Sequence, residues 1–313
     1  MDSDYPSFSL RMLNAIIAMC RGDVTMPDLL RRLGYCDHYI ELEFGGSNGA
    51  VRPEIITCSE DQGHSILWEW KKGGHVDRDQ IVRYAGVEPK HLRTGALVPA
   101  SACGASDVAL VVPEAKGDDA ERVLAEMALA FPVVGRGDAH LRLSHNRFAV
   151  TELNEGFSAP LVVDFAHQPL SYVPFDQESP DWAVAGPVAQ CILGYLLDGR
   201  PRFTILEVAE QTVGAWSSLA NAMKNRYKDR LVDLLREMEA HELSPYIRHN
   251  RARKAHLSLP TWDLVRRSAS SGAQWQVRLA RDFGKHSTLL INRLRAAGSA
   301  AEAESRQLTL GDL

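Results

Sequence analysis

At roughly 150 residues per domain, the 313 residues of this chain are enough for about two domains. Hydrophobic residues make up 45% of the sequence and charged residues 24%, a globular balance that excludes wholesale disorder. Five cysteines stand far apart, which excludes a disulfide scaffold and a zinc site of the paired CxxC kind. They are Cys20, Cys36, Cys58, Cys103 and Cys191.

The first 135 residues alternate between helical and extended patterns. Apolar residues recur at helical spacing over 8–20 and 26–33, and then at every second position over 39–44. The hairpin signal Gly-Gly-Ser-Asn-Gly follows, and strands are predicted over 51–58 and 64–71. Asp77 is a predicted N-cap, with Gln80 three residues later, for a helix that reaches Tyr84. A strand over 108–112, a helix over 119–130 and a strand over 131–134 follow, and this order indicates an α/β or α+β fold.

Two acidic residues and a lysine lie within the three-strand meander. Glu69 and Lys71 are two residues apart in a strand, so their side chains share one face while Trp68 and Trp70 face the other. Glu54 lies on the preceding strand, where its carboxylate can sit beside that of Glu69. Adjacent carboxylates repel each other unless they share a cation, and oxygen ligands with waters suit Mg²⁺ or Mn²⁺. A lysine beside such a pair can orient the attacking water and offset negative charge in a phosphoryl transition state.

An exposed ion pair between Glu69 and Lys71 is the alternative interpretation. The strand around them is strongly apolar, and unused charges are costly in a buried strand, which favours a functional pair. Glu41, on the same predicted strand face as Glu43, is a further candidate ligand, although solvated strand charges explain both residues equally well. The motifs of serine hydrolases, P-loop NTPases and dinucleotide-binding enzymes are absent from the sequence.

These residues resemble the motif of the PD-(D/E)XK nuclease superfamily. Pro53-Glu54 matches the first acid, with Glu where Asp is usual, and Glu69-x-Lys71 matches the second acid and the lysine. Gln80 and Tyr84, on one helical face, are similar to the Q-xxx-Y element of the RecB-like branch, although an ordinary polar helix face explains them equally well. The resemblance covers about residues 5–135. It implies an α/β restriction-endonuclease-like αβββαβ core, Mg²⁺ (or Mn²⁺) as cofactor, and these five residues in a site that hydrolyses DNA.

The charge balance changes along the chain. Residues 1–199 carry 16 Lys and Arg against 28 Asp and Glu, a net charge of −12, whereas residues 200–313 carry 19 against 12, a net charge of +7. We therefore expect the C-terminal third to contact any polyanion. Two domains that simply differ in surface charge are the alternative.

The basic third has a helix-turn-helix layout. Helices are predicted over 187–197, 205–212 and 215–241, and strands over 243–248 and 255–259 flank a basic tip. The pattern over 187–260 resembles a winged helix, in a second, mainly helical domain. A solvated charged helix, or a winged helix used for protein contacts, is the alternative. The candidate DNA-binding residues are Lys224, Arg226, Lys228, Arg230, Arg248, Arg251, Arg253 and Lys254.

We expect a nuclease-like domain over 1–180, a winged-helix-like domain over 181–262, a helical extension over 263–297 and a flexible tail over 298–313. Residues 150–185, rich in Pro, Asp and Ser, are predicted to be loop and linker. No signal-peptide pattern opens the chain and no apolar run is long enough to span a bilayer, so we expect a cytoplasmic protein without membrane contact.

The predicted function is a metal-dependent DNA endonuclease in restriction, anti-phage defence or repair, acting as a homodimer or with a partner subunit. The alternatives are the strand-cutting subunit of a transposition complex and a non-catalytic DNA-binding regulator on a nuclease-like scaffold. Gln307-Leu308-Thr309-Leu310 also resembles the start of the Q-L-x-L-F peptide that binds the bacterial sliding clamp, with Gly311 where an aromatic residue is expected. The alternative is that this segment docks on its own domain or has no role.

Overall fold

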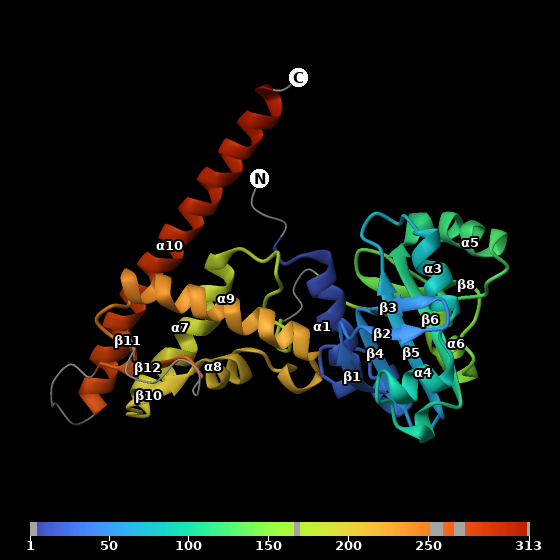
Figure 1. Cartoon of the computed structure of the whole chain (residues 1–313), viewed down its shortest axis with the longest axis horizontal. Coiled ribbons are helices and arrows are strands. Elements are labelled where there is room, and N and C mark those ends of the chain that lie inside the picture. Colours follow the sequence, from blue (N-terminus) through green and yellow to red (C-terminus); the bar gives the residue numbers. More distant parts are fainter. Residues whose placement is uncertain (1–4, 166–169, 251–258, 266–272, 312–313) are drawn as a thin grey trace. The chain divides into compact units, whose positions relative to one another are not determined.

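The computed structural model describes residues 5–165, 170–250, 259–265 and 273–311, with side chains over 5–165, 170–250, 259–265 and 274–300. The chain forms two compact units. The first consists of residues 8–172 and 217–223, and the second consists of residues 1–7, 173–216 and 224–313. Figure 1 labels the elements of both units.

The first unit is built on a mixed sheet, which has seven strands among the described residues, in the order β1-β4-β5-β6-β7-β8-β9. The strands β1, β4 and β5 form an antiparallel meander, β6 and β7 continue parallel to β5, and β8 and β9 are antiparallel at the far edge. Their bounds are β1 Cys36–Ile40, β4 Ile55–Ser59, β5 His64–Trp70, β6 Ala105–Pro113, β7 Val133–Arg136, β8 His140–His145 and β9 Leu161–Val162.

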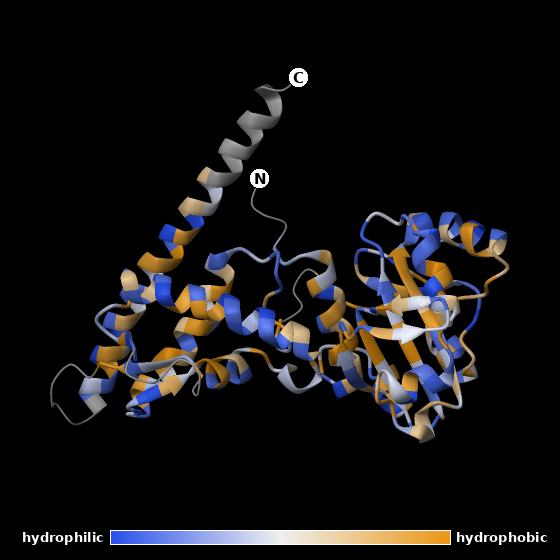
Figure 2. Cartoon of the chain, viewed as in Figure 1, coloured by the Kyte–Doolittle hydropathy of each residue, from blue (hydrophilic) through white to orange (hydrophobic). Residues whose placement is uncertain are grey.

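Helices cover both faces of this sheet, which is why the central strands β4 and β5 are buried throughout (Figures 1 and 2). On one face, apolar side chains of α3, α4 and α5 pack in one core with β4, β5 and β6. On the other face, Trp68 of β5 packs against Phe157 of α6, and α1 contacts β1. The helices of the unit are α1 Phe8–Arg21, α2 Leu29–Arg32, α3 Arg78–Ala85, α4 Pro89–Thr94, α5 Gly117–Glu126 and α6 Thr151–Ser158, with short 3-10 turns η1 Ala100–Ala102 and η2 Glu114–Lys116.

The predicted order helix, meander, helix, strand, helix, strand is present as α1, β1-β4-β5, α3, β6, α5 and β7. The first meander strand was misplaced, because it covers Cys36–Ile40 and not residues 39–44. Glu41 adopts a φ of 49°, a left-handed conformation that ends the strand although the apolar alternation continues. The residues beyond it form a separate hairpin of β2 Phe44–Gly46 and β3 Gly49–Val51.

The segment 150–185 is not simply a linker, since it contains α6 and β9. Leu153 and Phe157, four residues apart, are both fully buried and make α6 part of the core. Its single apolar stripe is short and is followed by polar and proline-rich sequence, so composition over the whole segment concealed it.

The second unit combines helices with a three-stranded antiparallel sheet in the order β10-β12-β11. Thr204 caps α8 in a capping box with Glu207, as the sequence predicted. The first helix begins at Asp181 and contains Pro187, so it starts earlier than the predicted residue 187. The elements are α7 Asp181–Leu197, β10 Arg202–Thr204, α8 Ile205–Thr212, the turn η3 Trp216–Ser218, α9 Asn221–Ala240, β11 Ile247–His249, β12 Thr261–Leu264 and α10 Ala273–Gly311.

The helix α10 is 39 residues long and includes most of the segment predicted to be a flexible tail. Arg293 fixes it to α9 and to the turn after α9 through hydrogen bonds to Glu237 and Glu242, both 2.7 Å from a guanidinium nitrogen. Gln307 to Leu310, the predicted clamp-binding segment, lies in the last turns, where the backbone is described. No helix in the described part of the chain has the length and apolarity that a membrane crossing requires.

Candidate active site

The central strand β5 and the residue after it carry two of the predicted site residues. Glu69 is 4% exposed, and Lys71 follows the last strand residue, held by a 2.9 Å hydrogen bond from its backbone N–H to Val111 O. Lys71 Nζ donates a 2.8 Å hydrogen bond to Glu69 Oε1. Trp68 faces the opposite side of the sheet, with its ring 6.4 Å from that of Phe157. The alternation predicted from the sequence is therefore correct.

The helix α3 supplies two more residues to the same place. Its N-cap, Asp77, accepts a 2.9 Å hydrogen bond from the backbone N–H of Asp79, as expected for a capped helix that begins immediately after a loop. Gln80, one turn before Tyr84, accepts a hydrogen bond from Lys71 Nζ. Tyr84 is buried, and its hydroxyl donates a 2.7 Å hydrogen bond to Glu69 Oε2. Both side chains therefore contact the Glu69 and Lys71 pair.

Glu54 precedes β4 and is placed by its backbone, whose N–H donates a 3.0 Å hydrogen bond to Trp68 O. Burial, followed by the negative charges of Glu69 and Glu41, raises the pKa of the Glu54 carboxyl to about 8. Lys71 opposes this shift. The charges of Glu54 and Glu69 therefore repel each other, and a cation bound by both would relieve this repulsion.

Glu41 lies near this pair, although it is not part of a strand. Its left-handed backbone turns the chain so that its N–H donates a 3.1 Å hydrogen bond to Glu54 O. The charge of Glu41 contributes to the raised pKa of Glu54, so its carboxylate is close to the candidate site. The predicted shared strand face of Glu41 and Glu43 is wrong, because β1 ends at Ile40.

The donor set fits a magnesium-type ion. Mg²⁺ in proteins commonly takes one or two carboxylates and keeps several waters, and Glu54 and Glu69 offer two carboxylates. Among the described residues there is no group of three or more His, Cys, Asp or Glu side chains arranged to hold a metal ion. An ion at this site would therefore depend on water or substrate oxygens for the rest of its coordination.

A cleft of about 510 Å³ adjoins the elements that carry the site. One wall is formed by residues 73–79, the end of the loop from β5 together with the start of α3, and the other is formed by Lys116, Asp119 and Val123 around α5. Gly74 has a φ of 73°, and a Cβ atom there would lie 2.6 Å from the Lys116 side chain. A glycine at this position thus permits the close approach of the two walls.

The predicted DNA-binding residues fall into different environments. Lys224, Arg226, Lys228 and Arg230 are all half-buried on α9. Arg226 lies within hydrogen-bond distance of the Gln177 side-chain amide. Arg230 donates to the backbone carbonyls of Asp176 and Ser179 and to the Asp181 carboxylate, so this guanidinium has a structural role. Arg248 on β11 is exposed. Arg251, Arg253 and Lys254 lie outside the described residues.

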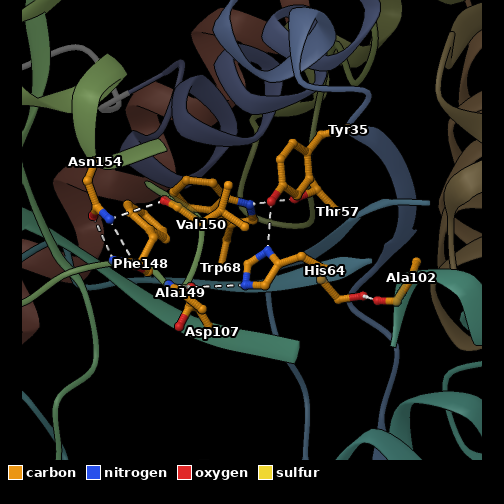
Figure 3. Close-up of polar contacts among 11 residues, drawn as sticks. Tyr35, Thr57, His64, Trp68, Ala102, Asp107, Phe148, Ala149, Val150 and Asn154 are labelled. Atoms are coloured by element: carbon orange, nitrogen blue, oxygen red, sulfur yellow. Dashed lines mark hydrogen bonds and ion pairs between the residues drawn. The ribbon is translucent and has the colours of Figure 1, made fainter. Parts of the chain in front are cut away.

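A second polar cluster, which the sequence did not indicate, begins at the other end of β5 (Figure 3). His64 is fully buried, with Nδ1 2.7 Å from the Tyr35 hydroxyl and Nε2 3.0 Å from Asp107 Oδ2. The same carboxylate oxygen accepts a 2.8 Å hydrogen bond from the backbone N–H of Ala149, just before α6. The cluster therefore fixes the α6 segment to the sheet. Its members are 29 and 43 residues apart in sequence, so no local pattern brings them together.

Comparison with known proteins gives one match. A family model described as the MJECL32 domain matches residues 9–172, nearly the same range as the main segment of the first unit. All five residues of the candidate active site lie within the matched range. No curated protein and no solved structure matches the chain.

Proposed function

The chain belongs to the MJECL32 domain family, and we propose that its first unit is a metal-dependent deoxyribonuclease that hydrolyses phosphodiester bonds. One observation carries the proposal. Glu69 and Lys71, chosen from their strand spacing, and Gln80 and Tyr84, chosen from the resemblance, form a connected set of hydrogen bonds. Glu54 interacts electrostatically with that set. Buried charges are rarely kept together without a structural or chemical reason.

The topology also supports the proposal. A helix, an antiparallel meander, a crossover helix and a parallel strand occur in the order of the αβββαβ core that the resemblance implies. Glu54 and Glu69 flank the β4–β5 hairpin of that meander, and Gln80 and Tyr84 lie on the crossover helix. These locations support the proposal that the first pair are the acids and the second pair the Q-xxx-Y element.

Glu54 and Glu69 would hold the ion, since they are the carboxylates that raise each other's energy when both are charged. A bound Mg²⁺ supplies Lewis-acid polarisation of a phosphate oxygen and a more acidic water. Tyr84 holds one oxygen of Glu69 and would thereby fix the orientation of this carboxylate as a ligand.

In this proposal Lys71 acts as a cation held in a fixed position. Its side chain is 17% exposed, and its ammonium group is held between Glu69 and Gln80, so it has a defined place beside the acids. From there it orients a water for attack on the phosphorus and offsets negative charge that develops on the phosphoryl oxygens. Gln80 helps to fix this ammonium group and would act as a positioning residue.

The second unit would add affinity for DNA. The strand order β10-β12-β11, with α8 and α9 between β10 and β11, supports the proposal of a winged helix. The exposed Arg248 lies on β11, at the base of the β11–β12 hairpin that corresponds to the wing. The excess of basic residues after residue 200 favours contact with phosphates.

The test is a cleavage assay with the full chain on supercoiled, linear, single-stranded and branched DNA, with Mg²⁺, Mn²⁺ or Ca²⁺ and with a chelator. We expect cleavage with Mg²⁺ or Mn²⁺ that chelation abolishes and that the double variant Glu54→Gln/Glu69→Gln lacks. DNA binding without cleavage of any substrate by the wild-type chain would instead favour a regulator on a nuclease-like scaffold.

A further inference from the structure

Two cysteines that are far apart in the sequence face each other across the first two strands of the meander. Cys36 on β1 is directly opposite Cys58 on β4 in the antiparallel register. Their Sγ atoms are 3.8 Å apart and share a thiol hydrogen bond. Opposite residues in antiparallel strands have Cα atoms about 4.5–5.5 Å apart, within the range of about 4.4–6.8 Å that disulfides span. Rotation of the side chains is therefore sufficient to join the two sulfur atoms.

The two thiols differ in access to solvent. Of the five cysteines, all of which the structure describes, Cys36 is exposed and the other four are buried. A dissolved oxidant therefore reaches Cys36 first. The neighbouring Cys58 is only 2% exposed and is protected from the oxidant. An accessible thiol next to a protected partner is the arrangement found at sites that oxidise reversibly.

The surroundings of Cys36 favour its thiolate. The hydrogen bond from the Cys58 thiol lowers the pKa of Cys36 to about 7, against the opposing effects of burial and of the carboxylates of Asp37 and Glu60. Asp37 is itself paired with Arg21, whose guanidinium donates hydrogen bonds of 2.9 and 2.7 Å to its carboxylate. The hydrogen bond to Cys36, followed by burial, raises the pKa of Cys58, which keeps this second thiol protonated until it reacts.

We propose that Cys36 and Cys58 form an oxidation site at which a peroxide converts the two thiols to an intramolecular disulfide. The Cys36 thiolate attacks one peroxide oxygen, the O–O bond breaks, and hydroxide (or alkoxide) leaves, which gives a sulfenic acid on Cys36. The Cys58 sulfur then attacks the Cys36 sulfur, the S–O bond breaks, and the hydroxyl leaves as water with the proton of Cys58. Two electrons pass from the thiols to the peroxide, and a dithiol reductant reverses the change.

The disulfide would close a loop that contains the candidate nuclease residues Glu41 and Glu54. It would also covalently join the edge strand β1 to β4, which begins one residue after Glu54. The proposal stands independently of the nuclease proposal, because it rests on the register and exposure of two cysteines.

The test treats the folded full chain with hydrogen peroxide, blocks the remaining thiols, and maps the products by mass spectrometry. We expect a loss of about 2 Da, recovered with dithiothreitol, and a cross-linked pair of peptides that contain Cys36 and Cys58. Cys58→Ser should lose the cross-link and instead trap a sulfenic acid on Cys36 with dimedone. Cys103→Ser, which removes a buried cysteine elsewhere in the same unit, is the matched control and should behave as wild type.

Three results would overturn the proposal. The first is sulfinic acid on Cys36 with Cys58 still a free thiol. The second is a cross-link from Cys36 to Cys20, the buried cysteine whose pKa Cys36 influences. The third is a wild-type chain whose five thiols all survive peroxide. None of these results depends on DNA cleavage, so failure of the nuclease proposal leaves the test unaffected.

Discussion

The Tyr84 hydroxyl donates a 2.7 Å hydrogen bond to Glu69 Oε2, while the other oxygen of the same carboxylate accepts from Lys71. Both oxygens of Glu69 are therefore held, one by Lys71, which directly follows β5, and the other by Tyr84 of α3. Burial, together with the charge of Glu69, raises the pKa of Tyr84, so the hydroxyl remains a donor at all physiological pH values. The orientation of the acid depends on this bond.

Tyr84→Phe removes that donor and preserves the ring. We expect stability to fall by about 1–2 kcal/mol and cleavage to fall by about tenfold or more, with weaker Mg²⁺ binding, because Glu69 loses its fixed orientation. Tyr35→Phe is the matched control, since it also removes a buried hydroxyl but one that contacts His64. It should lower stability similarly and leave cleavage per folded molecule unchanged. Equal loss of cleavage in both variants would contradict a specific role for Tyr84.

Lys71→Met should abolish detectable cleavage, a loss of at least about 100-fold, while DNA binding stays nearly unchanged. The reason is that the ammonium group is fixed beside the two acids, whereas most phosphate contacts are expected in the second unit. Lys90→Met, which changes a largely exposed lysine paired with Glu88, is the control. Wild-type cleavage by Lys71→Met would remove the nuclease assignment from this site.

The raised pKa of Glu54 predicts a pH-dependent stability difference. Between pH 4.5, its ordinary pKa, and about pH 8, the folded chain binds a proton that the unfolded chain releases. Its contribution to stability is thus fully present below pH 4.5 and is lost as the pH rises through about 8. Without metal, Glu54→Gln should be more stable than wild type by about 1–3 kcal/mol near pH 9 and nearly equal to it near pH 4.5.

Urea unfolding of both proteins in the presence of a chelator measures this difference in stability. The same unfolding experiments with added Mg²⁺ then measure how much the ion stabilises each protein. The ion should stabilise wild type more near pH 9 than near pH 6, because binding displaces the Glu54 proton at the lower pH. A stability difference between wild type and Glu54→Gln that does not change with pH would show that Glu54 ionises normally.

Arg248 and Arg230 should respond differently to substitution by alanine. Arg248→Ala should weaken DNA binding several-fold and reduce the salt dependence by about one counterion, because the side chain is exposed. Arg230→Ala should lower stability by about 1–3 kcal/mol, since its guanidinium bonds to the 176–181 segment, with the same salt dependence as wild type. Salt titrations of the full chain, combined with thermal unfolding, measure both. The opposite assignment of effects would contradict the environments described for these residues.

Local sequence determined those features that depend on neighbours in the chain. The cap at Asp77, the capping box of Thr204 and Glu207, and the shared face of Glu69 and Lys71 follow from spacings of two to four residues. At such spacings the backbone geometry of a helix or strand fixes relative directions. The helix α6 escaped prediction because its apolar stripe is short and the helix is stabilised by tertiary burial. The left-handed turn at Glu41 escaped prediction because this backbone conformation ends the strand although the alternation of apolar residues continues.

By itself, therefore, the sequence determined the α/β class of the first unit, its element order and the choice of candidate site residues. Only the tertiary structure decided which of these residues make contact and what their surroundings do to them. Burial, together with the charges of Glu69 and Glu41, gives Glu54 its raised pKa, and the strand register places Cys36 opposite Cys58. The buried contacts of His64 with Tyr35 and Asp107 have the same origin. Such pairings depend on sheet register and solvent exclusion across tens of residues, and the local periodicity of the sequence does not encode them.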